Sequence, residues 1–179
     1  MRRRILIALV LSIVALWSVS ALAYHADPRA LASPVRGVRA ASVRSTFGAR
    51  RSGGRRHQGA DIFAPRGTPV VSAHDGLVVH VGTNTLGGIV VHTLGRRGVL
   101  CYYAHLDRVA PGVHAGLPVS EGTVLGTVGN TGNARTTPPH LHFEARPLAW
   151  GLQAVDPVRL LGGRVGDGRP RAGIHRRFR

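Results

Sequence analysis

Short apolar runs separated by glycine turns constrain the fold of this chain more than any other feature of its sequence. The runs are rich in Val, Ile, Thr and Tyr, which favour strands, and glycine pairs such as Gly87-Gly88 punctuate them. They comprise residues 69–72, 77–81, 89–92, 99–104, 123–128 and 141–145. Helix is expected only as single turns, one after His105 and one over residues 157–161. The spacing therefore predicts an all-β, antiparallel domain that begins near Arg44 and ends near Leu161.

Five residues that can bind a metal or transfer a proton come from separated segments of this domain: His57, Asp61, His105, His140 and His142. Side chains alternate between the two faces of a strand, so His140 and His142 should point the same way. Gly59 and Pro65 disfavour a helix around Asp61, and we expect a loop that enters a strand containing Asp61. Two histidines and one aspartate would complete a catalytic zinc site with an open position, which leaves two histidines for proton transfer.

These motifs, in this order, resemble those of the lysostaphin-type, or LytM-like, zinc endopeptidases, which cut the peptide part of bacterial peptidoglycan. The resemblance is carried by residues 47–48, 57–61, 64–70, 75–76, 103–106, 126–132, 140–144 and 156–161. It implies a LytM-type β domain in which His57, Asp61 and His142 bind Zn²⁺ and in which His105 and His140 are the catalytic histidines. No member of this set is missing, and the resemblance therefore implies an active zinc metallo-endopeptidase.

Two other functions remain as alternatives. Some relatives have lost metal ligands and act as non-catalytic activators or localisers of another cell-wall hydrolase. A cationic envelope-binding protein with a closed structural zinc site would need a fourth ligand, which His105 or His140 would have to supply.

The implied mechanism assigns a role to each part of the site. Zinc would polarise the scissile carbonyl and lower the pKa of its bound water from 15.7 to about 7. His105 and His140 would jointly handle the proton of that water and of the leaving amine, and the sequence does not show which is the base. Glu144 shares a strand face with His142, so it either orients that imidazole or lies at the sheet rim. The bond that is cut stays open between a D-alanine cross-link, a glycine-rich bridge and another envelope peptide.

Three departures from the family pattern bear on the shape of the cleft. Pro138-Pro139 should stiffen the loop before His140. The family's frequent Gly-Asn before the middle strand is replaced by Gly87-Gly88-Ile89. The segment between Phe47 and His57 is short and basic, with Arg50, Arg51, Arg55 and Arg56.

Several other residues have competing interpretations. Cys101 is the only cysteine, so no intrachain disulfide can form. Strand alternation puts Cys101 on the face of Tyr103 and His105, which makes a thiol nucleophile an alternative, although a lone strand cysteine usually fills the core. Tyr102 or Tyr103 would either donate to an oxyanion or pack in the core. The remaining histidines are expected to be structural or surface residues: His25, His74, His80, His92, His114 and His175.

The two ends of the chain differ in composition from the domain. Residues 1–23 combine three arginines, an apolar run and Ala-Leu-Ala before Tyr24, which predicts a cleavable export signal. The alternative is an uncleaved signal anchor, because residues 5–23 approach the roughly 20 residues of a membrane span. Either way the domain would work in the cell envelope, as a periplasmic or extracellular protein. Residues 24–43 predict a linker, and residues 162–179 predict a basic, disordered tail.

The net charge of +16 comes with arginine as the only cationic residue besides histidine, because the chain has no lysine. Such a charge attracts polyanions, which in an envelope would be peptidoglycan carboxylates, anionic lipids or other anionic wall polymers. The alternative is that the exclusive use of arginine reflects coding bias. Nucleic acid is the usual alternative for a basic chain, and the export signal and the few aromatic residues argue against it. Membrane contact is expected only if the anchor stays uncleaved.

Overall fold

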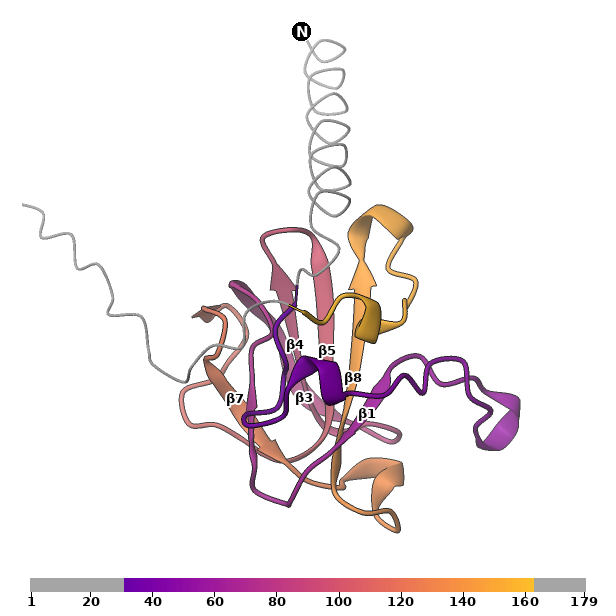
Figure 1. The fold of residues 1–179 in the computed structure, drawn as a ribbon. Helices are drawn as coiled ribbons and strands as arrows, with labels where there is room; N and C mark the ends of the chain where they lie inside the picture. Colours follow the sequence, from indigo (N-terminus) through magenta and orange to yellow (C-terminus); the bar gives the residue numbers. More distant parts are fainter. Residues whose placement is uncertain (1–30, 163–179) are drawn as a thin grey trace, which may run out of the picture.

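Eight strands joined by short turns make up one antiparallel sheet over residues 31–162, the part of the 179-residue chain that the computed structural model describes (Figure 1). The strands are β1 (Ala60–Phe63), β2 (Pro69–Val71), β3 (Gly76–Asn84), β4 (Gly88–Gly95), β5 (Val99–Val109), β6 (Pro118–Val119), β7 (Val124–Val128) and β8 (His140–Pro147). The described residues also contain five 3₁₀ turns: η1 (Ala40–Ser42) and η2 (Ser52–Gly54) before β1, η3 (Gly132–Ala134) between β7 and β8, and η4 (Leu148–Trp150) and η5 (Pro157–Arg159) after β8. The predicted all-β, antiparallel class is confirmed.

The order of the strands puts β8 and β5 near the middle of the sheet. The hydrogen-bonded path runs β1-β8-β5-β4-β3-β6, and β7 pairs with both β2 and β5. The inward faces of β5 and β8 form the core, where the rings of Tyr103 and Phe143 lie 5.3 Å apart between centroids. Elements far apart in the sequence therefore share one sheet, and the site residues that they carry can meet.

Strand β8 shows why this sheet can carry a site. Its apolar residues alternate with polar ones, and Leu141, Phe143 and Ala145 are fully buried in the core. His140 and His142, on the other face, point away from that core, as the alternation predicts. One face of β8 thus packs in the core, and the other face can carry functional side chains.

Two expectations about local structure have opposite outcomes. The helical turn expected after His105 is wrong, because β5 continues to Val109 and pairs with β7 there. The turn at the end of the domain is confirmed as η5, where the Asp156 side chain accepts a hydrogen bond from the backbone N–H of Val158 at 3.1 Å.

Residues 31–43 differ from the linker predicted for residues 24–43. Leu31 and Val35 are 1% exposed and belong to the core cluster. Leu31 forms a parallel bridge with Leu161, and Val35 forms an antiparallel bridge with Val70. The segment therefore packs with the domain, because its few apolar residues are spaced to fill gaps beside β2 and η5 rather than to form a strand.

The predicted signal segment and nearly all of the predicted tail lie outside the described residues. Within residues 31–162, no helix has the length and apolar character needed to cross a membrane.

Candidate metal centre and active-site cleft

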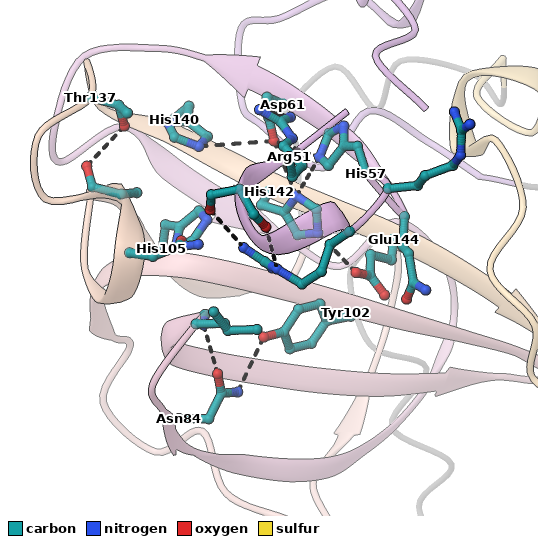
Figure 2. Close-up of a pocket in the computed structure, with 18 of the residues that line it drawn as sticks. Arg51, His57, Asp61, Asn84, Tyr102, His105, Thr137, His140, His142 and Glu144 are labelled. Carbon is teal, nitrogen blue, oxygen red and sulfur yellow. Dashed lines mark hydrogen bonds and ion pairs between the residues drawn. The ribbon is translucent and has the colours of Figure 1, made fainter. Parts of the chain in front are cut away.

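An open cleft of about 870 Å³ contains all of the residues proposed from the sequence for metal binding and proton transfer. Strands β1, β5 and β8 form its floor, and the loops around residues 51–58, 84–87 and 133–138 form its walls. The structure thus brings His57, Asp61, His105, His140 and His142 together (Figure 2).

Three of these residues converge on one point. Asp61 lies opposite His142 in the register of β1 and β8, so the two side chains are neighbours on one face. His57 Nε2 lies 3.0 Å from Asp61 Oδ1, and His142 Nδ1 lies 3.1 Å from the same oxygen. The two nitrogens are 2.8 Å apart. This is the one group of potential metal ligands that the described residues contain.

Hydrogen bonds on the far side of each imidazole fix its tautomer. His57 Nδ1 donates to the backbone carbonyl of Thr46 at 2.9 Å, which leaves Nε2 as an acceptor. His142 Nε2 donates to Glu144 Oε1 at 2.9 Å, which leaves Nδ1 as an acceptor. Two nitrogen lone pairs and a carboxylate oxygen therefore face one another, and such a set requires a proton or a cation between its members. The donor set fits zinc, which takes histidine nitrogen and carboxylate oxygen ligands.

The carboxylates around this point favour positive charge. Burial opposes ionisation of Asp61, but its contacts with His142 and His57 outweigh burial and hold its pKa well below the usual range. Burial also disfavours a charged His142, yet the hydrogen bonds to Asp61 and Glu144 raise its pKa overall. Glu144 is itself held by Arg146 Nε at 2.7 Å. The carboxylates of Asp61 and Glu144 thus favour a cation at this point of the cleft.

His105 and His140 lie beside this centre and are not part of it. Their rings are 5.0 Å apart between centroids, and His140 Nε2 lies 3.9 Å from Asp61 Oδ1. His105 Nδ1 donates to the carbonyl of Thr131 and His140 Nδ1 donates to that of Pro138, each at 2.9 Å. In each neutral ring the proton is therefore on Nδ1, and Nε2 is left as an acceptor. Burial, together with the nearby His140 and His142, lowers the pKa of His105 to about 4, so this imidazole is neutral at pH 7.

A break in strand alternation places His105 in the cleft. The expectation that Cys101, Tyr103 and His105 share a face holds for Cys101 and Tyr103, which are fully buried in the core. It is wrong for His105, whose φ of 62° lies in the left-handed region. The register between β4 and β5 shifts next to it, so the chain bulges and the imidazole turns to the opposite face.

Before this break, the regular alternation of β5 separates the roles open to the two tyrosines and the cysteine. The Tyr103 hydroxyl accepts a hydrogen bond from the backbone N–H of Ala73 at 3.0 Å inside the core, away from the cleft. Burial raises the pKa of the Cys101 thiol, which lies in the core and does not line the cleft. Tyr102 does line the cleft, and Asn84 donates to its hydroxyl at 3.2 Å (Figure 2).

Sequence reasoning left open the role of Glu144 and missed the contacts of Arg51 and Arg146. Glu144 bonds to His142, as one of the two alternatives for it required. Arg51 Nη2 lies 2.5 Å from Asp61 Oδ2, on the oxygen that faces away from the histidines. Arg146 continues the alternation of β8 beyond Glu144, so a stricter use of the two-residue period would have placed it in the cleft.

Known structures share this fold. The catalytic domain of lysostaphin from Staphylococcus simulans matches with a TM-score of 0.58 and 30% identity, over 66% of this chain and 91% of that one. A zinc-containing peptidase from Vibrio cholerae matches with a TM-score of 0.60 and 30% identity, over 75% of this chain and 40% of that one. The fold is therefore that of the LytM and lysostaphin peptidase domains.

Sequence comparison identifies the family of peptidases to which this domain belongs. The model of peptidase family M23 matches residues 55–157, and the chain belongs to this family. Over 109 residues the chain is 43% identical to the L-Ala–D-Glu endopeptidase of Bacillus subtilis. That match covers 57% of this chain and 33% of the relative, so the two proteins correspond over one region only.

Proposed function

We propose that this protein is a zinc-dependent endopeptidase that hydrolyses peptide bonds in bacterial peptidoglycan. The observation that carries the proposal is the convergence of His57 Nε2, Asp61 Oδ1 and His142 Nδ1 within about 3 Å of one another in an open cleft. Relatives named as an L-Ala–D-Glu endopeptidase and as peptidoglycan DD-endopeptidases support the choice of substrate.

The proposed mechanism divides the work between two groups of residues. His57, Asp61 and His142 would hold zinc, which supplies a Lewis acid that polarises a peptide carbonyl and lowers the pKa of a bound water to about 7. His105 is neutral at pH 7, because its pKa is lowered to about 4, so its Nε2 is available to accept a proton from the attacking water.

His140 and Tyr102 complete the set of groups that a substrate would meet. His140 Nε2 faces the same point, and the pair of histidines can pass a proton on to the leaving amine. The Tyr102 hydroxyl lies in the cleft as a potential donor to the developing oxyanion. Because peptidoglycan lies outside the cytoplasm, the proposal also requires the export that residues 1–23 predict.

The test is digestion of purified peptidoglycan, with the products identified by mass spectrometry. The full protein, loaded with zinc, should release cross-linked or stem peptides with new amino termini, and a chelator should stop the release. A His105→Ala variant should bind zinc and yet release no product. His114→Ala, which replaces an exposed histidine outside the cleft, is the matched control and should behave as wild type.

One outcome would contradict the proposal. If the zinc-loaded, folded protein released nothing from several types of peptidoglycan, the enzyme would be rejected. Stimulation of a cell-wall amidase would then be measured, because a non-catalytic activator would remain.

A further inference from the structure

A small hairpin rich in arginine forms one wall of the cleft. We call residues 48–57 the arginine hairpin, because they contain Arg50, Arg51, Arg55 and Arg56. The backbone N–H of His57 donates to the carbonyl of Ala49, and that of Arg51 donates to the carbonyl of Arg55, each at 2.9 Å. Gly53 and Gly54 form the tip with φ values of 71° and 72°, which glycine adopts without strain. The loop is therefore an ordered element, and it projects from the sheet beside β1 (Figure 1).

This hairpin concentrates charge of one sign. Residues 50–56 hold four arginines and no acidic residue. Arg50 and Arg56 are paired across the two arms, and like charges directly opposite one another destabilise a pair of strands. An anion bound beside the hairpin would relieve this repulsion.

The described residues offer little to neutralise these arginines. Arg51 pairs with Asp61, the one carboxylate within residues 31–162 that forms an ion pair with the hairpin. Arg55 donates to the carbonyl and hydroxyl of Ser52, and Arg56 donates to the carbonyl of Gly48, so both contact uncharged oxygens. Arg55 and Arg56 are exposed and line the cleft.

The acidic side chains of the cleft are already engaged. Asp61 contacts His57, His142 and Arg51, as described above. Glu144 is shared between His142 and Arg146, whose own Nη2 reaches Gln58 at 2.5 Å. The cleft of the candidate metal centre is thus also lined by Arg55 and Arg56, and the described residues provide no carboxylate that pairs with them. A carboxylate that pairs with them would have to come from a bound ligand.

We propose that Arg55 and Arg56 bind a free carboxylate of the substrate peptide, so that the cleft selects acidic peptides over neutral ones such as glycine bridges. This inference rests on the proposed endopeptidase function and specifies its substrate class. Guanidinium groups bind carboxylates through charge-assisted, often bidentate hydrogen bonds. Because the contact lies beside the reacting atoms and not on them, it acts on binding and therefore on KM.

The experiment compares two synthetic stem peptides that differ in one group. One carries the free α-carboxylate of its D-glutamate residue, and the other carries a carboxamide there. Cleavage gives kcat and KM for each peptide. Fluorescence anisotropy gives Kd for the same two peptides on the His105→Ala variant, so binding is measured even where no cleavage occurs. The wild type should prefer the carboxylate about tenfold in KM, and high salt should reduce the preference.

Matched variants locate the contact. The double variant Arg55→Gln/Arg56→Gln should bind both peptides with the affinity that the wild type has for the carboxamide peptide. The double variant Arg55→Lys/Arg56→Lys should keep part of the preference, because charge remains but the bidentate geometry is lost. The control is Arg36→Gln/Arg96→Gln, which removes the same charge from exposed positions outside the cleft and should keep the full preference. Circular dichroism checks that each variant is folded.

The outcomes separate the two proposals. Equal affinity of the wild type for both peptides, or an unchanged preference in Arg55→Gln/Arg56→Gln, overturns the role of the arginine hairpin. A clear preference in binding supports the hairpin even if neither peptide is cleaved, and the absence of release from peptidoglycan in the digestion described above would then contradict the proposed endopeptidase alone.

Discussion

At the scale of single residues, the outer hydrogen bonds of His57 and His142 determine what the site can bind. The Thr46 carbonyl and the Glu144 carboxylate each take the N–H of one imidazole, so the other nitrogen of each ring faces Asp61 as an acceptor. A ring with the other tautomer would place an N–H toward the centre and repel a cation. These partners are therefore part of the candidate metal centre.

Glu144→Gln should weaken zinc binding by about 10- to 100-fold. The amide oxygen can still accept from His142 Nε2, but the negative charge that makes the imidazole a better ligand is lost. A competition titration with a zinc chelator measures the Kd. Glu121→Gln, in an exposed position outside the cleft, is the control, and equal affinity in the two variants would argue against the role of Glu144.

The neutral state of His105 predicts a dependence of stability on pH. Its pKa is lowered from 6.5 to about 4 in the folded protein, mainly by burial. Between these values the unfolded chain binds a proton that the native state resists, so stability is lost as the pH falls through this window. The loss should reach about 2 kcal/mol between about pH 7 and about pH 4.5.

Urea unfolding of zinc-free protein at the two pH values measures this loss. His105→Asn should show a smaller loss, because asparagine does not titrate and tolerates the left-handed φ of this position. His114→Asn controls for removal of an imidazole as such. If the stability of wild type and of His105→Asn depended equally on pH, the lowered pKa of His105 would be contradicted.

The side chains of the candidate site could be predicted from the sequence, but several of their hydrogen-bond partners could not. The ordered motifs identified the five titratable residues that the structure brings into one cleft. The carbonyls of Thr46, Thr131 and Pro138 could not be foreseen, because every residue has a carbonyl and only the folded loops select three of them. The face of His105 was mispredicted for a related reason, since a bulge depends on pairing with β4 and leaves no mark in the alternation of β5.

At the scale of elements, the pairing of β1 with β8 sets the distance between Asp61 and His142. The strands approach closely at Gly59, where an added Cβ would lie 2.3 Å from the carbonyl oxygen of Phe143. Glycine is needed at this position because there is no space for a side chain. Its backbone conformation does not require glycine, since its φ lies outside the left-handed region. The sequence suggested only that Gly59 disfavours a helix, since the approach of a strand more than 80 residues away is not visible locally.

Gly59→Ala should therefore lower the free energy of unfolding by about 2–3 kcal/mol and weaken zinc binding. Gly112→Ala is the control, because an added Cβ there meets nothing within 4 Å and pays only the cost of its left-handed φ of 79°, about 1 kcal/mol. Denaturant unfolding and zinc titration measure both effects. A Gly59→Ala protein with wild-type zinc affinity would show that β1 can shift without disturbing the centre.

At the scale of the whole molecule, the segment before the predicted domain boundary belongs to the fold. The strands had clear signals in their β-branched runs, and most were predicted within a few residues of their bounds. Residues 31–43 have no such period, because they fill spaces between other elements and do not extend the sheet. Leu31 shows this most clearly, because it is 1% exposed and contacts Leu160 and Leu161, which follow η5.

Leu31→Ala should lower the free energy of unfolding by about 2–4 kcal/mol, because it leaves a cavity in the core. Leu77→Ala, at a position that is 40% exposed, should cost less than about 1 kcal/mol. Denaturant unfolding of the two variants compares them directly. A small effect at Leu31 would mean that residues 31–43 are a dispensable linker, as the sequence alone had suggested.

We propose that His57, Asp61 and His142 are the metal ligands and that His105 and His140 are not. The most direct test is the zinc content of the purified protein and its variants, measured by inductively coupled plasma mass spectrometry. We expect a single zinc ion per chain in the wild type and in His105→Ala, and loss of zinc in His142→Ala. Zinc retained by His142→Ala, or lost from His105→Ala, would contradict it.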